Sequence, residues 1–501
     1  MVCRSRENIL AFSKQGVQPP VKIPDFARLT FHLAAMPSKK LHSYRRQLSA
    51  MKKTVALLTT LILCCSFAQA KNPPNIVYII SDDQAWTDYG FMAHPHIRTP
   101  HLDKLASESV VYERGYVPTA LCRPSLLTLV TGQYAHRHGV TGNDPSPKNT
   151  PRNSEDYHNK RAKLISYLDQ FETVPELLGE KGYLSHQSGK WWEGSYSHGG
   201  FTHGMTRGFP EKGGRHGDDG LKIGRTGMQP IADFVDHAVE EKKPFFLWYG
   251  VFLPHTPHNP PERLLKRYRE QGHPLPVAKY YANCEWFDET CGQLIEILEK
   301  RGLRDDTLIV YVTDNGWINR TDRSAYAPKS KQSPNEGGVR TPIMFSWPNG
   351  NLQNGKRADV ISSIDLFPTA LAAAGARIPE NTPGINLMDS LTKQSPVDRD
   401  GIFGEGFAHD IADISKPETS LVYRWRIEGK WKLLLTYDGE VNRYASSHPR
   451  KEKRPQLFDL LADPHENRNL AADHPEVVAD LAAKIDGWWP VKDRKVLTKF
   501  E

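Results

Sequence analysis

Two pairs of oxygen-bearing side chains stand directly after apolar runs of this 501-residue sequence. Asp82 and Asp83 follow one run, and Asp314 and Asn315 follow another. An isolated acidic pair is usually a solvated turn, but two pairs that each end an apolar strand indicate a shared site, because ligands of open α/β sheets bind beyond the carboxyl ends of the strands. Carboxylate and amide oxygens are the ligands that hard cations prefer. We therefore predict that these four residues hold a metal ion, Ca²⁺ or alternatively Mg²⁺.

Two further polar side chains stand at or near the ends of apolar runs. Lys190 directly follows a third run, and His255 follows a fourth. An ammonium group at a strand end can neutralise an anion, and an imidazole can move a proton. We expect both to converge with the two acidic pairs on one site.

Three cysteines, Cys122, Cys284 and Cys291, follow the leader described below. Cys284 and Cys291 belong to one helical pattern, and their spacing separates the Cα atoms by about 10 Å, beyond the roughly 7 Å that a disulfide tolerates. We expect both to be packing residues. Cys122 is then a lone thiol in an exported protein, which suggests special chemistry rather than a disulfide.

The elements that must position these side chains follow the pattern of an α/β domain. From about residue 75, short apolar runs alternate with longer amphipathic ones, which predicts a large, mostly parallel sheet flanked by helices. The predicted strands are Asn75 to Ser81, Tyr183 to Ser188, Phe245 to Phe252, Leu308 to Thr313 and Pro342 to Trp347. The predicted helices include one that Thr99 caps and Pro100 begins, one over Thr173 to Gly179 and one over Tyr280 to Leu298.

The pattern changes after about residue 400. Three strand-like runs, separated by polar turns, precede an amphipathic helix. The runs are Leu421 to Glu428, Lys432 to Tyr437 and Gln456 to Leu460, and the helix is Pro475 to Trp489. This order predicts a smaller C-terminal antiparallel sheet with one covering helix. We therefore expect a catalytic domain over residues 71–400 and a C-terminal subdomain over residues 401–501.

The first 70 residues are predicted to be a leader. The apolar run Val55 to Phe67 follows Met51-Lys52-Lys53 and precedes Ala68-Gln69-Ala70, which is typical of a secretory signal peptide. The run is too short for a bilayer, which requires about 20 apolar residues, so we expect no membrane span. We predict an upstream extension over residues 1–50, a signal peptide over residues 51–70, and export to the periplasm or the exterior.

The leader also distorts the net charge. The whole chain holds 65 basic and 58 acidic residues, of which the first 70 positions contain 11 and 2. The remainder therefore holds 54 basic and 56 acidic residues, a net charge of −2. The apparent basicity belongs to the leader, so we expect no nucleic-acid partner.

The residues around the lone cysteine resemble a known nucleophile motif. Cys122-Arg123-Pro124-Ser125-Leu126 is similar to the Cys-x-Pro-Ser-Arg motif of the type I sulfatases, and the sequence through Gly139 continues as in that family. The other segments that resemble the family are Asp82-Asp83, Gly189-Lys190-Trp191, Pro254-His255-Thr256-Pro257, Asp314-Asn315-Gly316, and Lys331 five residues before Glu336-Gly337-Gly338. The resemblance spans about residues 73 to 490 and implies the alkaline-phosphatase-like fold.

The resemblance also implies a mechanism. A formylglycine-generating enzyme would oxidise Cys122 to formylglycine, which would also be a fifth ligand of the metal ion beside Asp82, Asp83, Asp314 and Asn315. One hydroxyl of its hydrate would attack sulfur beside this calcium ion. Lys190 and Lys331 would bind sulfate oxygens, while His255 could protonate or orient the leaving alcohol. The second hydroxyl would then expel sulfate. The implied substrates are sulfate esters of small molecules or oligosaccharides, with sulfated carbohydrate favoured.

Two positions depart from the family pattern. Leu126 stands in place of the motif arginine, and Trp192 in place of a histidine. Arg123 begins a helix and points about 100° away from Cys122, so we do not expect it to replace the arginine. Four residues of a glycine-rich region could supply positive charge, or could belong to a solvated loop: His198, His203, Arg215 and His216.

These departures leave two alternatives to a working sulfatase. One is a phosphodiesterase or phosphonate hydrolase of the same fold, which would use unmodified Cys122 or a metal-bound water. It is less favoured because two-metal phosphatases require further Asp and His ligands that the sequence does not identify. The other is a pseudo-enzyme that binds sulfated glycans without cleaving them, since metal and lysine positions serve binding as well as turnover.

Overall fold

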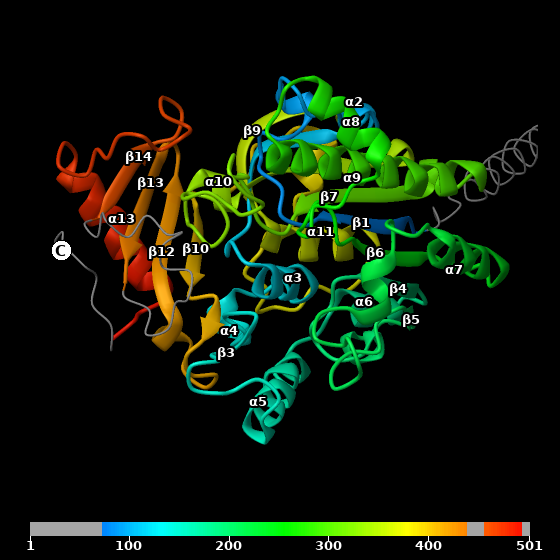
Figure 1. Cartoon of the computed structure of the whole chain (residues 1–501), viewed down its shortest axis with the longest axis horizontal. Helices are drawn as coiled ribbons and strands as arrows, with labels where there is room; N and C mark the ends of the chain where they lie inside the picture. The colour runs from blue at the N-terminus through cyan, green and yellow to red at the C-terminus, as the bar shows by residue number, and fades with distance from the viewer. Residues whose placement is uncertain (1–72, 438–454, 493–501) are drawn as a thin grey trace, which may run out of the picture. The chain divides into compact units, whose positions relative to one another are not determined.

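The five predicted apolar strands lie in one eight-stranded sheet (Figure 1). The computed structural model describes residues 73–437 and 455–492, so the predicted upstream extension (1–50) and signal peptide (51–70) lie outside the described residues. The strand order is β5-β4-β6-β1-β7-β8-β2-β9. The strands are β1 (Asn75–Ser81), β2 (Val110–Tyr116), β4 (Leu184–Gly189), β5 (His203–Gly204), β6 (Phe245–Gly250), β7 (Thr307–Thr313), β8 (Arg340–Ser346) and β9 (Gly355–Ser362). Only β8 runs antiparallel to its neighbours, which confirms the prediction of a mostly parallel sheet.

Both faces of this sheet are buried. On β1, Tyr78 and Ile80 belong to one apolar cluster, and Val77 and Ile79 belong to the other, as the two-residue period of a strand requires. The first cluster includes side chains of α3 (Cys122–Thr131), α6 (Val174–Gly179), α11 (Leu366–Ala373) and α12 (Met388–Lys393). The second includes side chains of α2 (Pro100–Ser107), α7 (Gln229–Glu240) and α9 (Leu275–Lys300). In Figure 1, α3 and α11 lie on one side of the sheet, and α2 and α9 lie on the other.

Strand direction places the site residues at one edge of the sheet. β1, β4 and β7 are parallel, so their carboxyl ends meet there. β8 is antiparallel to both β7 and β2, which makes β2 parallel to β7 and brings the start of α3 to the same edge. Because β8 is antiparallel to β7, its first residue lies at this edge, and so does the segment that precedes β8. The strand order therefore brings together five segments that are far apart in the sequence.

The C-terminal region forms a separate, four-stranded antiparallel sheet, as predicted. It consists of β10 (Ile402–Phe407), β12 (Leu421–Glu428), β13 (Trp431–Thr436) and β14 (Gln456–Asp459), with α13 (Pro475–Trp488) packed against it. The proposed division at residue 400 stays a prediction. A two-stranded parallel pair joins β3 (Asp144–Pro145) to β11 (Asp410–Ile411).

Some elements differ from the sequence predictions. β2, β9 and β10 were not predicted, because β2 and β9 carry charged residues and β10 contains two glycines. Thr99 does precede a helix that begins at Pro100, but its hydroxyl does not cap the helix. It donates instead to Asp103 Oδ1 and accepts from the Gly90 N–H, each at 2.8 Å. Within the described residues, no helix is long and apolar enough to cross a membrane.

Candidate active site

The thiol of Cys122 lies between two lysine side chains. Lys190 Nζ is 3.4 Å from Cys122 Sγ, and Lys331 Nζ is 3.2 Å from it. All three side chains are buried. Two buried ammonium groups that converge on one atom favour an anion at that position.

A carboxylate from the tip of β1 holds each lysine. Lys190 donates to Asp82 Oδ1 at 2.7 Å, and Lys331 donates to both oxygens of Asp83 at 2.6 and 2.7 Å. Asn315 Nδ2 donates to Asp83 Oδ1 at 2.7 Å. The predicted lysines and metal ligands therefore form one continuous network with Cys122.

Backbone geometry fixes two of these positions. Gly189 has a φ of +91°, and a Cβ there would lie 1.8 Å from the Gly250 carbonyl oxygen, so glycine is required for the Lys190 N–H to reach that oxygen at 2.7 Å. Asp83 has a φ of +65°, in the left-handed region that aspartate tolerates better than most residues. Its N–H donates to Asp314 Oδ1 at 3.0 Å, which joins the tips of β1 and β7.

Three buried oxygens at these tips accept no hydrogen bond from the described residues: Asp82 Oδ2, Asp314 Oδ2 and Asn315 Oδ1. Asp82 Oδ2 forms only an ion pair with Lys190. Burial raises the pKa of Asp82, against the effect of Lys190, and burial also raises the pKa of Asp314. A divalent cation would satisfy these oxygens and stabilise the charged carboxylates. The predicted ligand set therefore fits a hard metal ion.

A second possible ligand set overlaps the first. One ligand atom each of Asp82, Asp83, Cys122 and His255 lies within 4.8 Å of the others. This set omits Asp314 and would suit a softer metal, because it includes sulfur and nitrogen. Asp314 Oδ2 and Asn315 Oδ1 favour the oxygen-rich set, since a buried acceptor without a hydrogen bond is costly.

Charge at Cys122 is determined by burial and the two lysines. Burial raises the pKa of the Cys122 thiol to about 12, against the lowering effect of Lys190 and Lys331. Burial lowers the pKa of each lysine, but the neighbouring carboxylates outweigh it and leave both values above the ordinary one. The site therefore holds two positive charges beside a protonated sulfur at neutral pH.

His255 faces the same centre. Its Nε2 lies 3.3 Å from Asp83 Oδ2, and its Nδ1 bonds to the Thr256 carbonyl oxygen. Since a carbonyl only accepts, the ring proton is assigned to Nδ1. Burial, followed by the charges of Lys190 and Lys331, holds the pKa of His255 well below its usual value. The neutral ring therefore presents the Nε2 lone pair to the centre of the site.

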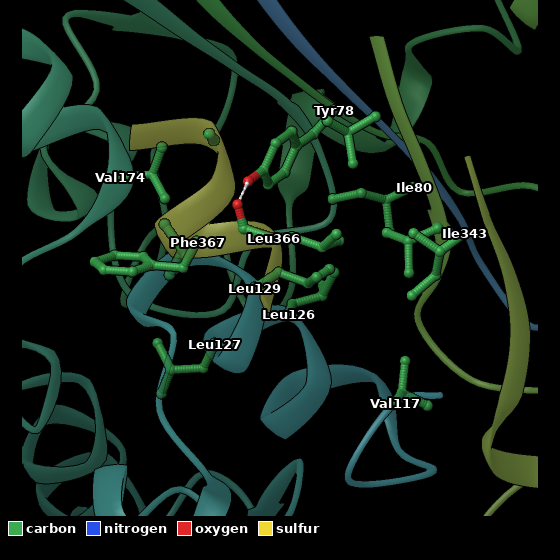
Figure 2. Packing of buried hydrophobic residues seen from close by; sticks show 14 of the residues in the cluster. Tyr78, Ile80, Val117, Leu126, Leu127, Leu129, Val174, Ile343, Leu366 and Phe367 are labelled. Carbon is green, nitrogen blue, oxygen red and sulfur yellow. Dashed lines mark hydrogen bonds between the residues drawn. The ribbon is translucent and has the colours of Figure 1, made fainter. Parts of the chain in front are cut away.

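Leu126, at the position of the motif arginine, is part of the core. Its side chain is 4% exposed and belongs to the apolar cluster that includes Ile80, Val117 and Ile343 (Figure 2). The neighbouring guanidinium of Arg123 binds Glu193 through Nε at 2.7 Å and Nη2 at 2.6 Å. This pairing agrees with the expectation that Arg123 does not replace the arginine.

Trp192, at the position of the family histidine, contributes an aromatic face. Lys190 Nζ lies 5.3 Å from the Trp192 ring and 5.2 Å from the Phe252 ring, within the range of cation–π attraction. The ring of His216 packs against Trp192 with 5.3 Å between centroids. The rings of Trp192 and Phe252 therefore line the site beside Lys190.

The site opens into a cleft of about 710 Å³. Of the four candidate residues in the glycine-rich region, Arg215 and His216 line this cleft. His198 instead bonds to Asp169, and His203 lies on β5 beside Thr202. Sequence reasoning missed several other lining residues: Asn143, Arg152, His258, Lys279, Trp317, Tyr326 and His409. Proximity to a predicted motif could have indicated His258 and Trp317, whereas the others had no such signal.

Comparison with known proteins identifies the family. The model of the Sulfatase family matches residues 74–376, more than half of the chain. The chain belongs to the sulfatase family. A second model, N-sulphoglucosamine sulphohydrolase, C-terminal, matches residues 330–488 of this sulfatase. The family assignment, the fold class and the enzyme class of sulfuric ester hydrolase agree with the sequence predictions.

Named relatives align along most of this sulfatase. Human arylsulfatase A is 29% identical over 486 residues, covering 84% of this chain and 88% of the relative. Human N-acetylgalactosamine-6-sulfatase is 27% identical over 471 residues, covering 83% and 85%. Among solved structures, Ps i-CgsB in complex with k-i-k-neocarrahexaose has a TM-score of 0.65 and 25% identity, covering 83% of this chain and 93% of that one.

Proposed function

We propose that this sulfatase hydrolyses sulfate esters of carbohydrates at the position of Cys122. The observation that carries the proposal is the approach of Lys190 and Lys331 to within 3.4 Å of Cys122 Sγ, above the carboxylates of Asp82 and Asp83. Positive charge around the nucleophile is what attack on a sulfate monoester requires, because negative charge builds on the oxygens.

Each residue has a proposed role in catalysis. Lys190 and Lys331 bind sulfate oxygens, and His255 orients the leaving alcohol through Nε2. Formylglycine, made from Cys122 by a formylglycine-generating enzyme, would supply in its hydrated form the attacking hydroxyl and a second hydroxyl that releases sulfate. The raised pKa of the Cys122 thiol argues against direct attack by the unmodified side chain, because a neutral thiol is a poor nucleophile.

The proposed metal is Ca²⁺, with Mg²⁺ as the alternative. Asp82, Asp83, Asp314 and Asn315 would hold it, and the buried oxygens of Asp314 and Asn315 that accept no hydrogen bond support the assignment. The ion would stabilise negative charge on the sulfate oxygens, in addition to the two lysines.

Sulfated carbohydrate is the proposed substrate class. The named relatives include sulfatases of N-acetylgalactosamine, and a structural neighbour was solved with an oligosaccharide. Export through the signal peptide over residues 51–70 is also proposed, since such substrates occur outside the cell.

The test combines mass spectrometry with sulfate release. Protein made with its native oxidase should carry the aldehyde or its hydrate at Cys122 and release sulfate from a panel of sulfated sugars. Cys122→Ala should abolish release, whereas Cys284→Ala, at a buried cysteine on α9, is the matched control that should retain it.

Two results would overturn the proposal. Faster hydrolysis of nitrophenyl phosphate or a phosphonate ester than of any sulfate ester would favour the phosphoester alternative. A fully reduced Cys122 in protein that binds sulfated sugars without releasing sulfate would favour a glycan-binding pseudo-enzyme.

A further inference from the structure

Three arginines surround one buried carboxylate beside the cleft. Asp144, whose side chain is 1% exposed, accepts from Arg161 Nη1 at 3.1 Å and from Arg215 Nε at 2.7 Å. Arg152 Nη2 lies 3.8 Å from Asp144 Oδ2. One negative charge therefore faces three guanidinium groups, which are always positive in proteins.

Two other buried carboxylates lie in this region: Glu193, which acts on Arg161, and Asp410, which lies opposite Asp144 in the β3–β11 pair and bonds to His409. Glu193 binds Arg123 through two parallel hydrogen bonds, so these two residues neutralise each other. Burial, followed by repulsion from Arg123, lowers the pKa of Arg161 to about 10. Burial and repulsion act on this pKa in the same direction.

Two of the three arginines are partly exposed, and both line the cleft. The side chain of Arg161 is fully buried, whereas those of Arg215 and Arg152 are 34% and 48% exposed. Both exposed arginines line the same cleft as Cys122. Among the described residues that line this cleft, none is an aspartate or a glutamate.

The two exposed arginines differ in how firmly they are held. Two nitrogens of Arg215 donate to Asp144, which fixes the plane of the guanidinium. Binding of a ligand to this group would therefore cost little side-chain entropy. Arg152 has only the 3.8 Å ion pair with that carboxylate, so its donors remain available. The pair thus offers several N–H groups to one anion at the wall of the cleft.

We propose that Arg152 and Arg215 form a second anion subsite, which binds a sulfate or a carboxylate of the same saccharide whose sulfate ester lies at Cys122. This inference rests on the proposed function. It narrows the substrate class to saccharides with at least two anionic groups, such as a disulfated hexosamine or a sulfated sugar linked to a uronate. A substrate with a single charge would lack this second contact and would bind more weakly.

The experiment compares kcat/KM across four probes in the full-length protein. The probes are nitrophenyl sulfate, monosulfated N-acetylgalactosamine, disulfated N-acetylgalactosamine, and monosulfated N-acetylgalactosamine linked to a uronate. The last two distinguish sulfate from carboxylate as the second anion. The variants are Arg152→Ala, Arg152→Lys and, as a matched control outside the cleft, Arg468→Ala, whose side chain is 77% exposed.

We expect Arg152→Ala to lower kcat/KM for at least one doubly charged probe. This loss should be about tenfold larger than the loss for nitrophenyl sulfate, because one charge-assisted hydrogen bond is removed. Arg152→Lys should restore part of this ratio, and Arg468→Ala should keep the wild-type ratio. The advantage of the doubly charged probe should also shrink as salt is added, because the subsite is partly exposed.

Equal losses on all four probes, or an equal change in Arg468→Ala, would overturn the subsite. If the wild type releases sulfate from none of the probes, the proposed function fails and the subsite is tested by calorimetry instead. Tighter binding of a doubly charged sugar to the wild type than to Arg152→Ala would then support the subsite. Equal affinity would overturn it.

Discussion

Lys432 Nζ on β13 lies 2.9 Å from Glu336 Oε1 at the start of α10 (Glu336–Val339). The same ammonium lies 3.0 Å from Glu466 Oε1, and Glu466 Oε2 accepts from the Glu336 N–H at 2.8 Å. All three side chains are at most 1% exposed. Because α10 begins five residues after Lys331, this buried ion pair connects the C-terminal sheet to the segment that carries a proposed catalytic lysine.

Lys432→Met should destabilise the protein by about 3–5 kcal/mol, because it removes the ion pair of buried Glu466 and leaves Glu336 with only Arg340 at 3.5 Å as a counter-charge. It should also lower kcat/KM for nitrophenyl sulfate under conditions where the variant stays folded. The control is Lys430→Met, whose side chain is 47% exposed and pairs with Asp459, and its cost should be about 0–1 kcal/mol. Urea unfolding and kinetics provide the comparison, and similar losses in both variants would contradict the positioning role.

Leu126→Arg should destabilise the fold, although it restores the family motif. The substitution places a guanidinium in the apolar cluster with Ile80, Val117 and Ile343, at an expected cost of about 3 kcal/mol or more. Leu126→Met, which conserves volume, should cost less than about 1.5 kcal/mol. Thermal unfolding measures both variants. A Leu126→Arg protein as stable as the wild type would show that the side chain can leave the cluster.

Ca²⁺ should raise the melting temperature of the wild type after treatment with a chelator. At a concentration about 100 times the Kd, the expected stabilisation is about 2.7 kcal/mol. Asp314→Ala should lose this effect yet remain folded, since Asp314 lies at a strand tip outside the apolar core. Asp473→Ala, at a side chain that is 54% exposed, should keep it. Stoichiometric zinc that resists exchange would refute the assignment to a hard cation.

Asp288 on α9 should make stability depend on pH. Burial raises the pKa of its carboxyl to about 7 from an ordinary value of 3.8. The folded state therefore binds this proton more tightly than the unfolded chain, so the contribution is fully present below about pH 3.8 and is lost as the pH rises through about 7.

Asp288→Asn removes that titration. The stability of this variant relative to the wild type should increase from pH 4 to about 7 and then level off. Glu289→Gln, at the neighbouring and more exposed side chain, is the control. Urea unfolding across this range measures the difference, and parallel pH profiles for Asp288→Asn and the wild type would contradict the prediction.

Much of the fold could be predicted because its core strands carry strong local patterns. β1 and β12 have the bounds that the sequence indicated, since each is bordered by polar residues or a turn and is almost fully buried. β9 could not be predicted, because its first half is exposed and polar and only its pairing with β2 makes it a strand. The short β5 likewise depends on β4.

The sequence by itself determined the types and order of the side chains at the site, through residues that stand at strand ends, and it determined the family. Only the tertiary structure decided that Lys331 lies 3.2 Å from Cys122, that Leu126 is a core residue, and that Arg152 and Arg215 share one carboxylate. These contacts join residues that are distant in the chain. Strand order and packing create them, whereas local periodicity encodes only which face of its own element a residue occupies.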